Sequence, residues 1–332
     1  MRLRADRVRV RVPATSANLG PGYDAMGVAL ALHDELEVRA VASSGVEVVV
    51  EGEGAGSVPD DERHLVVRAI RVALDHVGAP QAGLALTCRN AIPHGRGLGS
   101  SAAAVVAGII AARGLISEPE ALDDATVLAL ATQMEGHPDN AAPAILGGAT
   151  VAWTNATGGV GATQVEVHPE IAPVVMIPPT HLSTKAARGV LPEHVPHADA
   201  AFQAGRSALL VQALGRRPDL LLDATVDKLH QEYRRSVMPD SLALVDALRA
   251  TGVAAVVSGA GPTVLALARR LDGVPSAFAA PGGPGAAGAA QGTDADAAIA
   301  AAFGGVLGGW VIRPLAVDPS GAQLVVGEHP IG

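Results

Sequence analysis

The segment HGRGLGSSAAA, residues 94–104, combines glycines and serines in a spacing that could bind an anion. Its polar and flexible positions are Gly95, Gly97, Gly99, Ser100 and Ser101. The three alternate glycines let backbone amides approach a ligand with no Cβ in the way. The serines begin an Ala-rich stretch that favours a helix, whose first N–H groups have no acceptor within the helix. Amides and hydroxyls directed at one place form an anion site without any lysine, and the polyphosphate of a nucleotide is its natural ligand.

Two other interpretations of this loop stay open. Residues 97–102 also spell GxGxxA, the dinucleotide fingerprint, with Glu118 near the distance where a ribose-binding acid would lie. That fingerprint should follow a strand at once, but residues 90–94, including Pro93, intervene, which disfavours a dinucleotide-dependent oxidoreductase. The other interpretation is a purely structural turn before a helix, and the loop alone does not decide between them.

Three further segments place polar or small residues in turns. PATSANLGPGYD, residues 13–24, carries Asn18 and Asp24 in a turn that regular structure cannot use, and such loops often carry function. EGHPDN, residues 135–140, groups carboxylates with a histidine and an amide, and carboxylates suit Mg²⁺ together with phosphate oxygens. SGAGP, residues 258–262, is a second glycine-rich turn. Taken singly, each segment is also compatible with ordinary turn formation or a solvated helix end.

Composition and missing motifs exclude several classes of function. The 33 Asp and Glu outnumber the 24 Lys and Arg, and aromatic residues are rare, so no nucleic-acid partner is expected. Neither Lys185 nor Lys228 lies in a GxxxxGK[ST] loop, and the GxSxG and HExxH motifs are absent. HVPH, residues 194–197, contains Pro196 and has no third ligand nearby, so we reject a zinc site.

No segment suits a membrane or a secretory signal. The longest run of small apolar residues, 102–112, has eleven residues, well short of the roughly 20 that a spanning helix requires. The stretch MRLRADRVRVRVP never reaches an apolar signal region, and Cys88 is the only cysteine, so no intrachain disulfide can form. We therefore expect a cytoplasmic protein with no membrane partner.

Hydrophobic periodicity predicts strands and helices without strict βα alternation, which favours an α+β protein. Val and Arg alternate over residues 8–12, which predicts a strand that Pro13 ends. Pro138, Pro143 and two adjacent glycines predict irregular structure after residue 136. Further strands are expected at 27–41 with a return toward 46–50, and at 84–88, 149–154, 165–167, 174–177, 254–257, 264–268 and 310–317. Helices are expected at 65–77, along the Ala-rich stretch after the serines, and at 123–135, 184–189, 198–214 and 241–251.

The chain changes character near residue 160, after the Gly- and Thr-rich stretch WTNATGGVGAT, and we place a domain boundary there. The low-complexity segment PGGPGAAGAAQG, residues 281–292, cannot bury enough side chain to offset the entropy of ordering. We expect a disordered surface loop at 281–292.

Three segments resemble, in this order and at these separations, the motifs of the GHMP small-molecule kinases, a family named for galactokinase, homoserine kinase, mevalonate kinase and phosphomevalonate kinase. They are PATSANLGPGYDAMG, IPHGRGLGSSAAA and SGAGPTVLAL, and the resemblance runs from about residue 8 to residue 267. It implies an α+β enzyme of two domains, with the active site between them. The first, 1–160, would contain a left-handed βαβ unit and the ATP phosphate loop at 93–103, and the second, 161–332, would be ferredoxin-like.

Within the family, ANLGPGYD, EGHPDNAAPAILGG and STKAARGVLP most resemble the members that phosphorylate homoserine. The implied activity transfers the γ-phosphate of ATP to the side-chain hydroxyl of L-homoserine, on the route to threonine. Glu135 and one of the two serine hydroxyls, assigned to Ser101, would hold Mg²⁺. The family's usual state is a homodimer. The implied ATP-binding residues are Pro93, Gly95, Arg96, Gly97, Leu98, Gly99, Ser100, Ser101, Ala102 and Ala103.

The resemblance also implies the substrate contacts. Asp24 would bind the ammonium group, and Arg188 and Arg234 the carboxylate, because a planar guanidinium can bind both carboxylate oxygens. The helix phase leaves open whether Arg234 or its neighbour Arg235 faces the substrate. Asn18 and Asn140 would contact the reacting hydroxyl, and His137 and Thr184 would lie nearby. His64 stands where the family commonly has an asparagine near the adenine, which makes nucleotide selectivity less certain.

The implied catalytic residues are Asn18, Asn140 and Glu135. Several family members have an aspartate in place of Asn140, and an amide cannot act as that base. Because phosphoryl transfer depends mainly on alignment and charge neutralisation, we expect the two asparagines to align the hydroxyl without a strong base. Asp139 could still act as the base if its loop turns it inward.

Two alternatives remain. Another GHMP kinase substrate, such as mevalonate, is also a carboxylate, but it has no positive charge for Asp24 to bind. A catalytically silent binding module would be expected to lack Glu135 or the serine pair, and this chain has both.

Overall fold

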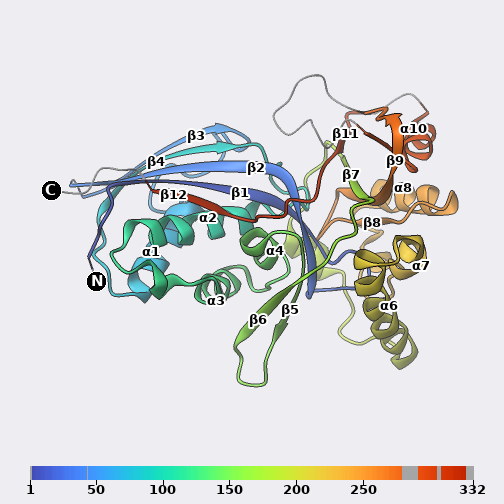
Figure 1. Ribbon diagram of the computed structural model, residues 1–332, viewed down its shortest axis with the longest axis horizontal. Coiled ribbons are helices and arrows are strands. Elements are labelled where there is room, and N and C mark those ends of the chain that lie inside the picture. The colour runs from blue at the N-terminus through green and yellow to red at the C-terminus, as the bar shows by residue number, and fades with distance from the viewer. Residues whose placement is uncertain (1, 43, 279–290, 305–307, 327–332) are drawn as a thin grey trace.

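Two β-sheets with helices packed against them form the framework of the chain (Figure 1). The computed structural model describes residues 2–42, 44–278, 291–304 and 308–326. Among the helices of these residues, none is long and apolar enough to cross a membrane.

The larger sheet is built on a long antiparallel pair of strands. Within the described residues its order is β12-β1-β2-β4-β3, with β5 paired to β2 and β6 to β5. In the first half of β1 the valines are buried and the arginines exposed, as the alternation predicts. The strands are β1 (Arg7–Ala17), β2 (Met26–Val41), β3 (Val46–Gly52), β4 (Gly83–Asn90), β5 (Ala149–Thr154), β6 (Val160–Val165) and β12 (Gln323–Val326).

Two expectations for these strands are wrong. Pro13 does not end β1, because the ladder with β2 shifts register between Pro13 and Ala14 and then continues to Ala17. β3 does not return to pair with β2 but lies parallel to β4. The connection between these parallel strands runs through α1 (Leu65–His76), which makes β3, α1 and β4 a βαβ unit. Its left-handedness stays a prediction.

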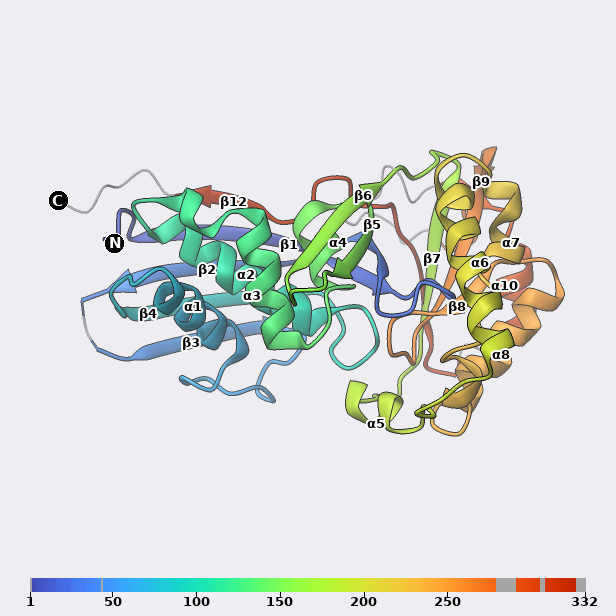
Figure 2. The same cartoon turned by 90° about the horizontal axis from the view of Figure 1, so that it is seen from below.

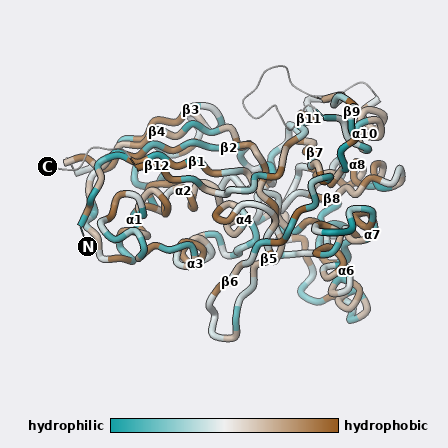
Figure 3. Tube along the Cα trace, viewed as in Figure 1, coloured by the Kyte–Doolittle hydropathy of each residue, from teal (hydrophilic) through white to brown (hydrophobic). Residues whose placement is uncertain are grey.

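Four helices lie on one face of the larger sheet, as Figure 2 shows from below. The central helix α2 (Ser100–Leu115) buries 12 of its 16 residues, which explains its Ala-rich and almost wholly apolar sequence. Figure 3 shows hydrophobic residues along α2 and the neighbouring strands. The other helices are α1, α3 (Asp124–Glu135) and α4 (Ala141–Leu146).

Helix α4 corrects the prediction of irregular structure after residue 136. Pro143 is the third residue of this helix, where its missing N–H would have no acceptor within the helix. Gly147, with φ of 73°, then follows the last helical residue.

The smaller sheet has the order β10-β9-β7-β11, with β8 also paired to β9. Omitting β10, the spatial order β11-β7-β9-β8 with helices after β7 and β9 is the ferredoxin-like arrangement, so this prediction is confirmed. Its strands are β7 (Ile171–Ile177), β8 (Ala255–Val257), β9 (Val264–Pro275), β10 (Gln291–Thr293) and β11 (Val311–Pro314). The helices that follow β7 and β9 are α5 (Thr184–Gly189), α6 (His197–Gly215), α7 (Leu221–Ala224), α8 (Pro239–Ala250) and α10 (Asp296–Phe303).

Alternate residues of β7 and β9 face two different cores. Val175 and Leu265 belong to the hydrophobic cluster that also contains α2, whereas Val174 and Val264 pack with α8. The smaller sheet is therefore buried on both faces.

Two predictions, the domain boundary at residue 160 and the loop at 281–292, can be compared with the two sheets. β6 and β12 lie largely or wholly beyond residue 160 yet belong to the larger sheet, and the division at 160 stays a prediction. The segment 281–292 lies outside the described residues as far as 290, and its last two residues, Gln291 and Gly292, are in β10 rather than in a loop.

Candidate active site

The three glycine-containing loops converge at one place and hydrogen-bond to one another. The Thr15 amide donates to the Leu98 carbonyl at 3.1 Å, and the Gly259 amide donates to the Ala17 carbonyl at 3.0 Å. The Ser258 hydroxyl donates to the Gly97 carbonyl at 2.7 Å. Segments far apart in sequence, from β1, from the start of α2 and from the β8–β9 turn, thus form one wall.

Two glycines of the loop before α2 are required by this packing. Gly97 has φ of 77°, and a Cβ there would overlap the Ser258 carbonyl oxygen and lie 2.8 Å from the Gly261 carbonyl oxygen. Gly99 has φ of 69°, and a Cβ there would overlap the Thr15 hydroxyl. We expected these missing side chains to make room for a ligand, but neighbouring loops fill that space.

The N-terminus of α2 presents amides that have no acceptor among the described residues, beside an acidic partner. Ala103 is the first residue of α2 whose amide bonds to a backbone carbonyl, that of Gly99. The Ser101 hydroxyl donates to Glu135 Oε1 at 2.6 Å, from the last residue of α3. This pair of hard oxygen atoms at a helix N-terminus suits a divalent cation bound together with phosphate.

A cavity of about 150 Å³ lies against this wall and contains most of the residues predicted for the site. Its side walls come from α2, the loop before α4, α5 and the β8–β9 turn. The predicted residues that line it are Asn18, Gly95, Gly97, Gly99, Ser100, Ser101, Ala102, Glu135, His137, Asn140, Thr184, Arg188 and Arg234.

Five predicted residues do not line this cavity. Leu98 and Ala103 are fully buried in the core, although Ala103 reaches the neighbouring cavity described below. The Arg96 guanidinium donates to the carbonyls of Pro178 and Pro179 at 2.9 and 2.8 Å, so it ties the loop to the segment after β7. The remaining two are Pro93 and Asp24.

Asp24 reaches the cavity through Arg188. Arg188 Nη2 lies 2.6 Å from Asp24 Oδ1, and Nη1 lies 3.0 Å from Oδ2, with about a third of each side chain exposed. The hydrogen bond to Asp24 raises the pKa of Arg188 above its ordinary value. The two groups that we assigned to opposite ends of a substrate therefore bind each other.

Arg234, rather than Arg235, faces the cavity. Arg234 is 1% exposed and donates to the carbonyls of Ala187 and Gly259 at 3.2 and 3.1 Å. Arg235 instead pairs with Glu232 at 2.7 Å and with Asp246 at 3.0 Å. Arg234 is therefore the arginine that lines the cavity, and its contact with a substrate stays a prediction.

Both asparagine side chains line the cavity, and each is held by one hydrogen bond at its oxygen and another at its nitrogen. Asn18 Oδ1 accepts from the Asp24 amide at 3.0 Å, and its Nδ2 donates to the Gly259 carbonyl at 2.9 Å. Asn140 Oδ1 accepts from the Thr15 hydroxyl at 2.8 Å, and its Nδ2 donates to Asp139 Oδ1 at 3.3 Å. Each amide nitrogen carries two N–H groups, and in the described part of the chain only one of them on each side chain has a protein acceptor.

Asp139 lies between His137 and Asn140. Its side chain is 2% exposed, and His137 Nδ1 lies 2.6 Å from Asp139 Oδ1. The hydrogen bond to Asp139 raises the pKa of His137, against the effect of burial. Asp139 therefore orients two side chains of the cavity.

A second cavity, of about 300 Å³, adjoins the first and shares Ser100 and Ser101 with it. Apolar side chains of β1, β2 and α2 form much of its lining, and His64 lies at its edge. His64 is 6% exposed, and its Nδ1 has no hydrogen-bond partner among the described residues. An apolar cavity beside an anion site, with one unpaired ring nitrogen, suits a nucleotide base.

Three contributors were not assigned from the sequence. Thr15 orients Asn140, the Tyr23 hydroxyl accepts from Arg188 at 3.0 Å, and His230 contacts Arg234. Thr15 and Tyr23 lie within PATSANLGPGYD, which we expected to carry function, although neither residue was assigned a role. His230 lies in no motif, so the sequence held no signal for it.

Comparisons with known proteins agree with this arrangement. The family model described as GHMP kinases N terminal domain matches residues 64–148, and that described as GHMP kinases C terminal matches residues 200–284. A homoserine kinase of Streptomyces coelicolor is 58% identical over 266 residues, covering 80% of this chain and 85% of that protein. A homoserine kinase of Mycolicibacterium smegmatis is 52% identical over 273 residues, covering 80% and 86%. The crystal structure of homoserine kinase from Cytophaga hutchinsonii is similar with a TM-score of 0.79 and 24% identity, covering 96% of this chain and 98% of that one.

Proposed function

The chain belongs to the GHMP kinase family, and we propose that it transfers the γ-phosphoryl group of ATP to the side-chain hydroxyl of L-homoserine. It is an ATP-dependent small-molecule kinase, and its curated relatives at 50 to 58% identity are homoserine kinases. The observation that carries the substrate assignment is the pairing of Asp24 with Arg188 beside the cavity, next to the Ser101–Glu135 pair.

The Asp24–Arg188 pair matches the two charges of an amino acid. The α-ammonium group can replace the guanidinium as the partner of Asp24, and the α-carboxylate can replace Asp24 as the partner of Arg188. Arg234 supplies a second guanidinium on the same side of the cavity. Mevalonate offers only the carboxylate, so it would leave Asp24 without a cation.

The phosphate groups of ATP would lie at the N-terminus of α2, where the amides of Ser100, Ser101 and Ala102 are available. Hard oxygen donors at Ser101 and Glu135 fit Mg²⁺, which would neutralise charge on the phosphate oxygens. The adenine would occupy the apolar cavity beside His64. We propose the same phosphate-loop residues as were predicted above. Among them, Arg96, Leu98 and Ala103 would hold the loop in its conformation through contacts within the protein.

In the transfer step the homoserine hydroxyl oxygen forms a bond to the γ-phosphorus while the bond from that phosphorus to the β–γ bridging oxygen breaks, releasing ADP. We expect the second N–H of Asn18 and of Asn140 to donate to the hydroxyl oxygen, so that the two amides hold it in line without accepting its proton. The proton leaves to a phosphate oxygen or to water. His137 and Thr184 complete the surroundings of the hydroxyl.

The first test is a coupled ADP-release assay with ATP, Mg²⁺ and, separately, L-homoserine, L-serine, L-threonine or mevalonate. We expect turnover on L-homoserine that collapses in Asp24→Ala. Turnover on mevalonate alone would overturn the substrate assignment, and turnover on none would overturn the proposed activity. The homodimer and the cytoplasmic location stay predictions, and light scattering on the purified protein tests the former.

A further inference from the structure

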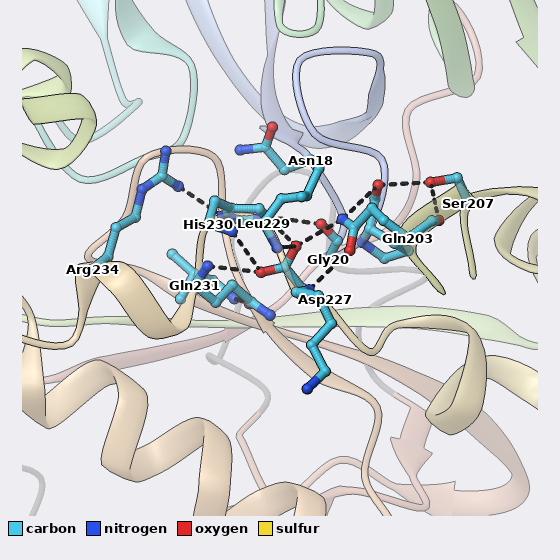
Figure 4. A network of polar contacts seen from close by, with 12 residues as sticks. Asn18, Gly20, Gln203, Ser207, Asp227, Leu229, His230, Gln231 and Arg234 are labelled. Carbon is cyan, nitrogen blue, oxygen red and sulfur yellow. Dashed lines mark hydrogen bonds and ion pairs between the residues drawn. The ribbon is translucent and has the colours of Figure 1, made fainter. Parts of the chain in front are cut away.

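A fully buried histidine, His230, connects Gly20, in the loop after β1, to Arg234 (Figure 4). Its Nε2 lies 2.8 Å from the Gly20 carbonyl oxygen, and its Nδ1 lies 2.9 Å from Arg234 Nη1. The ring of Tyr23 lies beside it, with the ring centroids 5.2 Å apart. Neither the predicted site nor the mechanism above uses this side chain.

Three polar groups around the ring determine its protonation state: the Gly20 carbonyl and Asp227 Oδ1, 3.5 Å away, on the side of Nε2, and Arg234 on the side of Nδ1. A carbonyl oxygen can only accept, so Nε2 carries the hydrogen, and a guanidinium can only donate, so Nδ1 is the acceptor. A doubly protonated ring could not accept from Arg234. The geometry thus requires the neutral tautomer with hydrogen on Nε2, and burial lowers the pKa of His230 in the same direction.

The backbone around His230 is held by Asp227. The Asp227 carboxylate accepts from the backbone amides of Leu229, His230 and Gln231 at 3.1, 3.0 and 2.7 Å, and from Gln203 Nε2 at 2.8 Å. This places the imidazole at a defined point between the Gly20 carbonyl and Arg234, as Figure 4 shows.

The contact with His230 leaves one part of the Arg234 guanidinium for a ligand. Both N–H groups of Arg234 Nη1 are engaged, one by the Gly259 carbonyl at 3.1 Å and one by His230. The Nε–H donates to the Ala187 carbonyl, from the residue before Arg188. Within the described part of the chain, no protein acceptor contacts Nη2.

We propose that His230 is a positioning residue for substrate binding: as a neutral acceptor at Nδ1 it fixes the Arg234 guanidinium so that Nη2 meets the substrate carboxylate. This proposal depends on the proposed function in one respect, because it takes the bound carboxylate to be that of L-homoserine. The same ring also donates from Nε2 to the Gly20 carbonyl, in the loop that carries Asn18 and Asp24.

Two substitutions separate the two nitrogens. Asparagine places an amide oxygen near the position of Nδ1 and keeps an acceptor for Arg234, whereas glutamine places an amide nitrogen near Nε2 and keeps only the donor to Gly20. We expect His230→Gln to raise the KM for L-homoserine about tenfold or more, because a buried charged donor loses its acceptor, with the KM for ATP little changed. His230→Asn should retain a KM much closer to that of the original protein.

The melting temperatures of the two variants serve as the structural control. Equal losses of stability with unequal homoserine KM values support the proposal, and equal KM values in both variants overturn it. A measurement on the unaltered protein keeps the proposal falsifiable if either variant fails to fold. In ¹⁵N-histidine-labelled protein, the His230 ring should show an unprotonated Nδ1 and a protonated Nε2 with and without L-homoserine, and any other tautomer would refute the role.

Failure of the proposed function gives a different result. If the original protein turns over mevalonate but not L-homoserine, the same pair of variants is compared on that carboxylate. If it phosphorylates L-homoserine while the two variants behave alike, only the role of His230 is lost.

Discussion

Arg188 and Asp24 form a two-point ion pair, with both guanidinium Nη atoms within 3.0 Å of the two carboxylate oxygens. The pair joins α5 of the smaller-sheet part of the chain to the loop after β1. Each charge is thereby neutralised at the position where a zwitterion would supply the opposite one. An amino acid can exchange one ion pair for two, whereas an uncharged alcohol cannot.

Removing one member of this pair should impair homoserine binding selectively. We expect Asp24→Asn to raise the KM for L-homoserine about tenfold to a hundredfold, since a charge-assisted hydrogen bond to the ammonium is lost. The KM for ATP should change little. Steady-state kinetics with each substrate varied in turn tests this, and a matching rise in the KM for ATP would show that the variant has a wider structural defect. Combined with Arg188→Gln, the effects should be less than additive, because each single variant leaves one charge without its partner.

An aspartate at position 140 should slow the reaction. The Asn140 amide donates to Asp139 Oδ1, so Asn140→Asp would set two carboxylates side by side and lose both N–H groups of the amide, including the one proposed to bind the hydroxyl. We expect kcat to fall about tenfold or more, and further than in Asn140→Ala, which loses the donor without adding a charge. The two variants are compared in single-turnover assays at saturating substrate. An increase of kcat in Asn140→Asp would show instead that the enzyme benefits from a base at this position.

Gly97 should be far less replaceable than its backbone angle alone requires. Gly97→Ala combines φ of 77° with overlap of the Ser258 carbonyl, whereas Gly78 has φ of 61° and open space around its Cβ position. We expect Gly78→Ala to cost about 1 kcal/mol, the usual strain of a left-handed residue. Gly97→Ala should cost distinctly more and also weaken ATP binding. Denaturant unfolding of both variants with and without ATP checks this, and equal costs would mean that the neighbouring loop yields easily.

A buried carboxyl near the second cavity should make stability depend on pH. Asp34 is 8% exposed, and burial raises its pKa from 3.8 to about 6, although the amides of Ala91 and Ile92 donate to it. The folded state thus holds the proton more tightly than the unfolded state. This contribution to stability is fully present below about pH 4 and is lost as the pH rises through about 6.

The comparison with Asp34→Asn isolates that contribution from the other titrating groups. The free energy of unfolding of the original protein, minus that of Asp34→Asn, should decrease by about 2 kcal/mol between pH 4 and pH 6, and by about 3 kcal/mol over a range that extends about one pH unit beyond each end. Denaturant titrations at a series of pH values give this difference. A constant difference would show that Asp34 has the same pKa in both states.

The sequence was sufficient where local chemistry determines position. Ser101 and Glu135 were expected to share a cation, and their side chains lie 2.6 Å apart. The helix expected at 184–189 is present as α5, and the Ser183 hydroxyl accepts from the Ala186 amide at its start. The choice between Arg234 and Arg235 could not be made, because the turn that carries them is a 3₁₀ segment (Glu232–Arg234) with a different angle between successive side chains from an α-helix.

The other features that the sequence did not predict depend on contacts between segments that are far apart in the chain. The pairing of β3 with β4 depends on the path of α1, and β1 passes Pro13 because β2 accommodates a shift in register. The fixed orientation of Asn18 requires Gly259, 241 residues away, and the contacts of His230 require the first motif at a distance of 210 residues. No local pattern could reveal such pairs in a single sequence.

The pairing of β12 with β1 has a consequence for how the protein is made. β1 leaves the ribosome long before Gln323–Val326, the segment that forms its antiparallel partner β12. Until then, the outer edge of β1 exposes unpaired backbone groups that can bind other strands, although its outward arginines oppose such association. The nascent larger sheet is therefore the intermediate on which chaperones should act, and circular permutants that place 323–326 before residue 7 should mature sooner during translation.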